Sequence, residues 1–135
     1  MGLDGCLRVA AASLLAVFYG ALYYNPRISP FGEYWLRNTY PNVKDVSTFD
    51  NSVPITVSSI CYFIIAIIIN QYVNYKQLSA GRLLRMGLEL TVLAALLQLP
   101  HTLFSGHNVR VFLVDQGHNL GVVLIKAFVL GWQRF

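Results

Sequence analysis

Hydrophobic residues along this chain fall into four long stretches, and polar residues gather in the links between them. The stretches cover approximately residues 7–24, 53–73, 84–104 and 111–132. Each is close to the ~20 residues that an α-helix needs to cross about 30 Å of hydrocarbon. Strands of a membrane barrel are about 10 residues long and alternate in polarity, which these stretches do not. The pattern therefore predicts an all-α membrane protein with four transmembrane helices, forming a single domain over residues 1–135.

The polar link over residues 25–52 contains the pattern of one further, shorter helix. Ser29 suits the position before a helix, Pro30 suits its first residue, and Pro41 cannot continue it. Three aromatic side chains fall on one face of this segment: Phe31, Tyr34 and Trp35. We therefore expect a short interfacial helix in this first loop, lying at the outer surface of the membrane.

Composition excludes an ordinary small soluble domain. Hydrophobic residues make up 56% of the 135 residues and charged residues only 12%, whereas soluble domains carry about 25% charged residues. The mean hydropathy of +0.53 points in the same direction. The net charge of +4 is scattered over the links without a basic stripe, which argues against a nucleic-acid-binding protein.

Basic residues indicate which links face the inner side of the membrane. The link between the second and third stretches holds Lys76, Arg82 and Arg85 and no acidic residue. Positively charged links stay on the cytoplasmic side, or on the matrix side of a mitochondrial membrane, so this link and both termini are predicted to lie inside. The same residues could bind an anionic lipid headgroup, although the positive-inside bias is the favoured explanation. Trp35 at the outer surface and Trp132 at the inner surface are expected to be aromatic anchors.

Two charged residues lie inside the last two apolar stretches. Lys126 is six residues from Trp132, or about 9 Å below the inner surface. Glu89 is five residues from Leu84, or about 7.5 Å below the same surface. A lone charge in hydrocarbon costs roughly 2.5–3.5 kcal/mol, and the two helices are joined by a short turn. We therefore predict an intramembrane ion pair between Glu89 and Lys126.

The last apolar stretch carries further polar residues at a near-helical spacing. Asp115, Asn119, Val122 and Lys126 fall on one face, and His118 lies beside them. Such a face is expected to turn away from lipid. It could face its own bundle, a water-filled cavity or a partner subunit, and Asp115, His118 and Asn119 are the candidate contact residues.

Histidines suggest one further kind of site. His101 and His118 lie in the outer half of the last two stretches, where they could ligate a haem between them. Asp115 could join them in a metal site. Because their spacing matches no metal-binding or catalytic motif, hydrogen-bonded or surface histidines are the favoured interpretation. We therefore expect no catalytic residue, no metal and no cofactor.

These features favour a non-catalytic accessory subunit of a multi-subunit membrane complex. A respiratory or ATP synthase complex of the mitochondrial inner membrane is the expected setting, with other membrane subunits and lipids as partners. The alternative is a small transport or ligand-binding protein with a cavity lined by Glu89, Asp115, His118 and Lys126. A small haem or metal enzyme is the third hypothesis.

Overall fold

The computed structural model describes residues 2–43, 52–76 and 78–131. Over these residues the chain forms five α-helices and no strand. Their bounds are α1 Leu3–Tyr23, α2 Pro30–Thr39, α3 Ser52–Lys76, α4 Ala80–Phe104 and α5 Val109–Gly131. All except α2 are long and apolar enough to cross a membrane. The predicted all-α, multi-pass membrane protein with four spans and a short helix in its first loop is confirmed.

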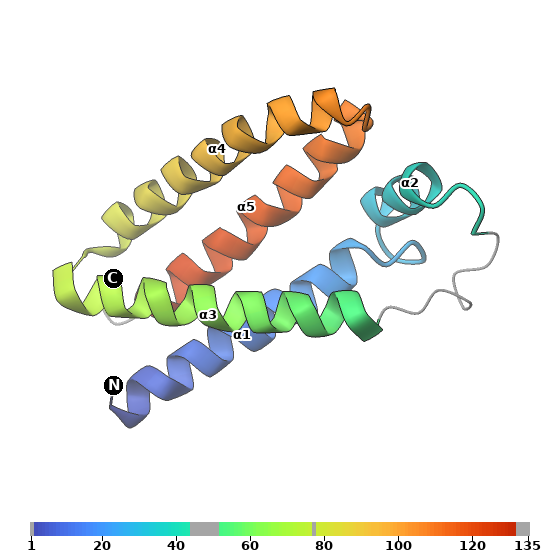
Figure 1. The fold of residues 1–135 in the computed structure, drawn as a ribbon. Helices are drawn as coiled ribbons and strands as arrows, with labels where there is room; N and C mark the ends of the chain where they lie inside the picture. The colour runs from blue at the N-terminus through green and yellow to red at the C-terminus, as the bar shows by residue number, and fades with distance from the viewer. Residues whose placement is uncertain (1, 44–51, 77, 132–135) are drawn as a thin grey trace.

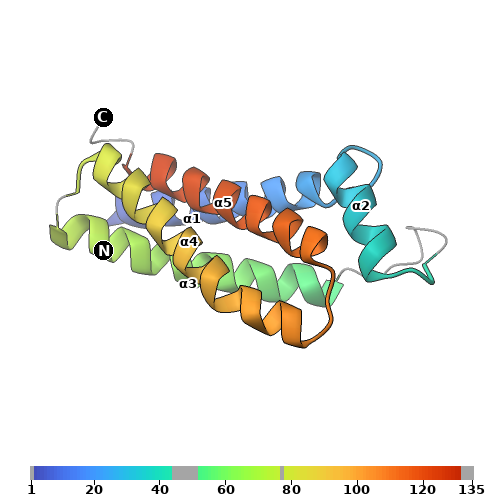
Figure 2. The ribbon, with the colours of Figure 1, turned by 90° about the horizontal axis from the view of Figure 1, so that it is seen from above.

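α5 is the central helix of the bundle, and it contacts α1, α2, α3 and α4. α1 and α4 run in one direction, and α3 and α5 run in the other (Figure 1). The starts of α1 and α4 and the ends of α3 and α5 therefore gather at one end of the bundle, which we call the inner end. The opposite, outer end carries α2, which runs across the direction of the long helices (Figure 2).

Small residues on one face of α1 allow it to lie close to α3 and α5. The buried positions of this helix are Gly5, Val9, Ala12, Ser13 and Ala16, which recur every three or four residues. In lipid, close contact over small side chains is a main source of helix association. The hydroxyl of Ser13 donates to the backbone carbonyl of Val9 at 2.8 Å, so this buried polar group is satisfied within its own helix.

Apolar side chains close the inner half of the bundle. One cluster joins α1, α3 and α5 through Val9, Ala12, Ala66 and Leu130. A second cluster joins α3, α4 and α5 through Val73, Leu83 and Ala127. All seven side chains are buried. Because both clusters include α5, they fix this helix against its three long neighbours.

The turn between α4 and α5 shapes the outer end. Gly106 has a φ of +69°, a conformation that glycine adopts without strain. The amide of His107 donates to the carbonyl of Thr102 at 3.0 Å, as in a Schellman motif at a helix end. Asn108 then caps α5, because its side-chain oxygen accepts a hydrogen bond from the amide of Arg110 at 2.8 Å.

α2 is held at the outer end by a close backbone contact. Ser29 precedes this helix and Pro30 begins it, as the sequence predicts, although the Ser29 side chain makes no capping hydrogen bond. A Cβ atom added at Gly32 would lie 2.5 Å from the carbonyl carbon of Tyr24, in the link that follows α1. Backbone atoms cannot move aside as a flexible side chain can, so only glycine fits here.

Candidate functional site

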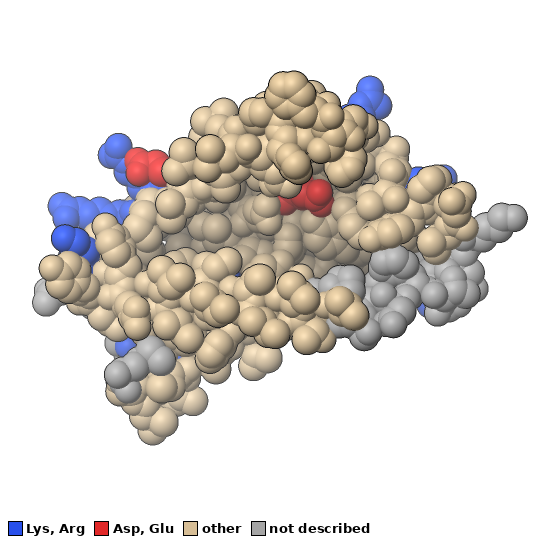
Figure 3. All heavy atoms as spheres, in the orientation of Figure 1, with Lys and Arg blue, Asp and Glu red and all other residues tan. Residues whose placement is uncertain are grey.

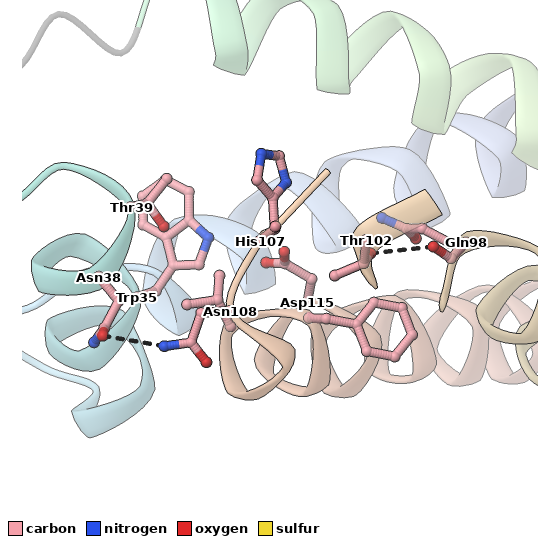
Figure 4. Close-up of a pocket in the computed structure, with 11 residues that line it drawn as sticks. Trp35, Asn38, Thr39, Gln98, Thr102, His107, Asn108 and Asp115 are labelled. Atoms are coloured by element: carbon pink, nitrogen blue, oxygen red, sulfur yellow. Dashed lines mark hydrogen bonds between the residues drawn. The ribbon is translucent and has the colours of Figure 1, made fainter. Parts of the chain in front are cut away.

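A recess opens at the outer end of the bundle, between α2, the end of α4 and the start of α5. It encloses about 450 Å³, which lies in the size range of small-molecule sites. Its polar lining comes from α2, from α4 and from the turn before α5: Asn38, Thr39, Gln98, Thr102, His107 and Asn108. Trp35, Val111 and Phe112 supply apolar surface, and Asp115 supplies a carboxylate (Figure 4).

Asp115 is the charged group of the recess. The Tyr24 hydroxyl donates to its Oδ1 atom at 2.8 Å, and the indole N–H of Trp35 faces the same carboxylate (Figure 4). None of the described lining residues is Lys or Arg, and no described cation forms a salt bridge with Asp115. Figure 3 shows acidic atoms inside a hollow of this face, with basic atoms gathered toward the two ends. Among the described residues, neutral donors therefore hold this carboxylate.

Tyr24 connects the recess with the helices behind it. It caps α1 just beyond the first span. Its ring centroid lies 5.0 Å from that of Trp35 and 4.8 Å from that of His118. Burial and the neighbouring Asp115 carboxylate raise the pKa of the Tyr24 phenol above its usual value. The phenol therefore stays protonated and donates its hydrogen to the carboxylate.

Four tyrosines enclose His118 behind the recess. The ring centroids of Tyr19, Tyr23, Tyr24 and Tyr62 lie 5.5, 5.5, 4.8 and 6.2 Å from that of His118. The Tyr62 hydroxyl lies 3.4 Å from Nε2, and the histidine is 4% exposed. None of these tyrosines was predicted from the sequence as a site residue. One signal was available, because Tyr19 and Tyr23 are four residues apart and share a helix face.

Lys126 lies deeper in the bundle, on the same face of α5 as His118. Its side chain is 0% exposed, and none of the described residues gives its Nζ atom a hydrogen bond. Nζ lies 4.8 Å from the ring centroid of Tyr62. A cation over an aromatic ring gains about 0.5–2 kcal/mol. Asp115, His118 and Lys126 thus form a polar line along α5.

Comparison with protein families covers nearly the whole chain. A family profile described as a protein of unknown function, DUF1761, matches residues 7–131. The chain belongs to this family. The matched region of this DUF1761 protein includes the recess and the polar line behind it. No curated protein and no solved structure matches the chain.

The predicted ion pair between Glu89 and Lys126 is not formed in this DUF1761 protein. Glu89 is exposed and accepts a hydrogen bond from Nε of Arg85, one turn away on α4, at 2.8 Å. α4 turns Gly87 toward α5, where an added Cβ atom would meet Val123. Glu89 is two residues further along, so it lies about 200° around the helix and points away. Equal depth in the membrane does not fix the direction in which a side chain points.

The polar face of α5 in this DUF1761 protein points into its own bundle. His118, Val122 and Lys126, each four residues apart, are buried, and Asp115 is half-buried. Asn119 is exposed, although it lies only about 40° around the helix from Asp115 and about 20° from Lys126. The predicted stripe therefore turns Asp115 and Lys126 into the bundle, whereas Asn119 stays exposed at its edge. Its use as a partner contact stays a prediction.

The two candidate haem ligands do not share a site in the DUF1761 chain. His101 is exposed near the end of α4, whereas His118 is enclosed between α1, α3 and α5. Within residues 2–43, 52–76 and 78–131, no three His, Cys, Asp or Glu side chains lie close enough to hold a metal ion. The geometry of the described residues therefore gives no support to the haem and metal alternatives.

The remaining predicted contacts of the DUF1761 chain lie at the two ends of the bundle. Lys76, Arg82 and Arg85 are exposed at the inner end, and Arg85 is engaged by the acidic side chain one turn away. Lipid binding by these residues stays a prediction. Trp35 is half-buried in the recess wall, and Trp132 lies outside the described residues.

Proposed function

We propose that this protein binds a small polar solute in the outer recess, as a membrane solute-binding or transport protein. The observation that carries this proposal is the environment of Asp115. Glu33 and Glu89 each pair with an exposed arginine one turn away, whereas Asp115 is half-buried and held by neutral donors. An ionisable residue inside a membrane bundle is a functional-site candidate because its burial is costly. This carboxylate faces a recess that a solute can enter.

The interior beneath the recess supports binding from one side rather than an open channel. Polar groups continue inward from Asp115 to His118 and Lys126, as far as the apolar inner half of the bundle. The inner clusters contain Leu130 and Ala127, which close the path beyond Lys126. Release of a solute at the inner end would therefore require these clusters to separate, as in alternating access.

The proposal is tested by thermal unfolding of the purified protein in a mild detergent, with a panel of cationic, anionic, zwitterionic and neutral small solutes. A ligand at 100 times its Kd adds about 2.7 kcal/mol to the free energy of unfolding. Val111→Phe enlarges a side chain of the recess wall and should abolish the effect. Leu113→Phe, at a position that is 61% exposed, is the matched control. The proposal is wrong if no solute of the panel stabilises the parent protein more than it stabilises the Val111→Phe variant.

An accessory subunit of a larger membrane complex is the second candidate, and one observation favours it. α4 packs mainly against α5, and its outward side chains remain exposed, among them Leu93, Leu96 and Leu97. Either lipid or a transmembrane helix of a partner subunit could cover this face. A respiratory or ATP synthase complex of the mitochondrial inner membrane is the partner class that we proposed from the sequence.

The native mass of the protein extracted in a mild detergent distinguishes the two candidates. An accessory subunit should migrate within a large assembly whose other subunits can be identified. A detergent-corrected protein mass near that of one 15.1 kDa chain would contradict the accessory role and leave the solute-binding proposal in place.

A further inference from the structure

The recess has the chemistry of a site for a small organic cation. We propose that its ligand is an amine or a quaternary ammonium compound, with Asp115 as the counter-ion and Trp35 as an aromatic wall. This inference rests on the proposed binding function and adds the chemical class of the ligand to it.

The charge of the recess selects the sign of the ligand. Asp115 is the acidic residue of its described lining, which contains no Lys or Arg. An anionic ligand would meet this carboxylate with no compensating cation, and like charges in a partly buried site repel strongly. A cationic ligand would instead form an ion pair with the Asp115 carboxylate, for which the described residues supply no cationic partner.

The aromatic residues favour an organic cation. Trp35 lines the recess, and its ring is held in place by Tyr24 and Tyr40, with centroids 5.0 and 5.6 Å away. Indole rings attract cations more strongly than other aromatic side chains, and recognition of quaternary ammonium groups commonly uses such rings. Phe112 adds further apolar surface to the lining, which suits methyl and methylene groups.

A divalent metal ion fits the same recess less well. Calcium takes six to eight oxygen ligands, usually from several carboxylates, and magnesium also demands near-octahedral geometry. The described lining provides one carboxylate, and its other oxygens belong to amides and hydroxyls. A single negative charge beside an aromatic wall matches an ammonium group, which needs no fixed coordination geometry.

The ammonium group could belong to a free solute or to the headgroup of a membrane lipid. Both sources present the same chemistry to Asp115 and Trp35. The position of the recess at the outer end of the bundle, where the spans end, gives access to both.

The fluorescence of the Trp35 indole can report ligand binding in the recess. The chain contains two tryptophans, so Trp132→Phe leaves a single fluorescent indole in the recess. Choline is the cationic probe, and dimethylbutanol, its neutral isostere, is the control ligand. We expect choline to change the fluorescence saturably with a Kd below about 10 mM, and the isostere to bind at least about tenfold more weakly.

Substitutions then separate charge from shape. Asp115→Asn retains an oxygen that can accept the Tyr24 hydrogen bond but removes the negative charge, so we expect choline to bind at least about tenfold more weakly. Glu33→Gln removes an exposed acid from the same end but outside the recess, and should leave the affinity unchanged.

The outcomes distinguish the ligand class from the binding function. If dimethylbutanol binds as tightly as choline, or if Asp115→Asn retains full affinity, the cation class is overturned while solute binding in the recess stands. The cation class is also overturned, and solute binding again stands, if choline does not bind but an anionic or neutral solute of the panel stabilises the protein. If choline binds, its affinity in maltoside micelles is compared with that in phosphatidylcholine nanodiscs. Weaker binding in nanodiscs identifies the lipid headgroup as the occupant, and equal binding identifies a free amine.

Discussion

Lys126 allows a quantitative test of how its charge is accommodated. In separated helices its flexible stem can reach the inner surface, whereas in the bundle its side chain is 0% exposed. Burial of such a charge costs roughly 2.5–3.5 kcal/mol, and the contact with Tyr62 returns up to about 2 kcal/mol. Lys126→Met removes both contributions while it nearly keeps the unbranched shape. The difference between these two ranges predicts that the variant is more stable by about 0.5–3 kcal/mol.

The assay is reversible unfolding in mixed micelles, followed by circular dichroism as the fraction of a denaturing detergent is raised. Lys126→Ala, which leaves a cavity as well, should be less stable than Lys126→Met by about 2–5 kcal/mol. Glu89→Gln combined with Lys126→Met should be additive within about 0.5 kcal/mol, because the two side chains do not meet. A loss of more than about 1 kcal/mol in Lys126→Met, together with non-additivity, would show that Glu89 does pair with the lysine and would refute this reasoning.

Three further predictions concern packing, hydrogen bonding and topology. Gly32→Ala should lower the free energy of unfolding by about 1–3 kcal/mol because its new Cβ atom meets backbone, whereas Gly81→Ala, with nothing within 4 Å, should be neutral or slightly stabilising in thermal unfolding. Tyr24→Phe removes the hydrogen bond to the recess carboxylate and should cost about 1–2 kcal/mol in the same assay; an unchanged unfolding temperature would mean that water replaces the phenol. Single cysteines at Asn42 and Ser79, in a chain without its native cysteines, should react with an impermeant thiol reagent from opposite sides of the membrane. Reaction of both from one side contradicts four spans.

Hydropathy predicted the helices well because a membrane span must satisfy two demands at once. Its backbone must be hydrogen-bonded within the segment, and its side chains must be apolar over about 30 Å. The predicted ranges 53–73 and 111–132 correspond to Ser52–Lys76 and Val109–Gly131, and no boundary of the four spans differs by more than four residues. The short helix of the first loop was also predicted, because its serine, proline and aromatic pattern is local.

The candidate site was only partly predictable because it depends on how the helices are rotated. Counting residues gives the depth of Glu89 and Lys126, but not the direction of either side chain around its helix axis. The aromatic cage of His118 is still less accessible to sequence reasoning. Tyr19 and Tyr62 belong to different spans and meet only after α1, α3 and α5 have packed. Asp115 was found because a carboxylate in an apolar stretch is conspicuous, whereas tyrosine is common in such stretches.

The two opposite charges on the inward face of α5 have a measurable consequence for the proposed ligand. Asp115 and Lys126 are 11 residues apart, so a cation bound at Asp115 lies about 16 Å from the ammonium group of Lys126. At an effective dielectric constant of about 20, two positive charges at this separation repel by about 1 kcal/mol. Lys126→Met should therefore tighten choline binding about fivefold, although residue 126 lies far from the recess. An unchanged affinity would mean that Lys126 carries no charge in the folded bundle, and the stability gain predicted from its buried charge should then be absent as well.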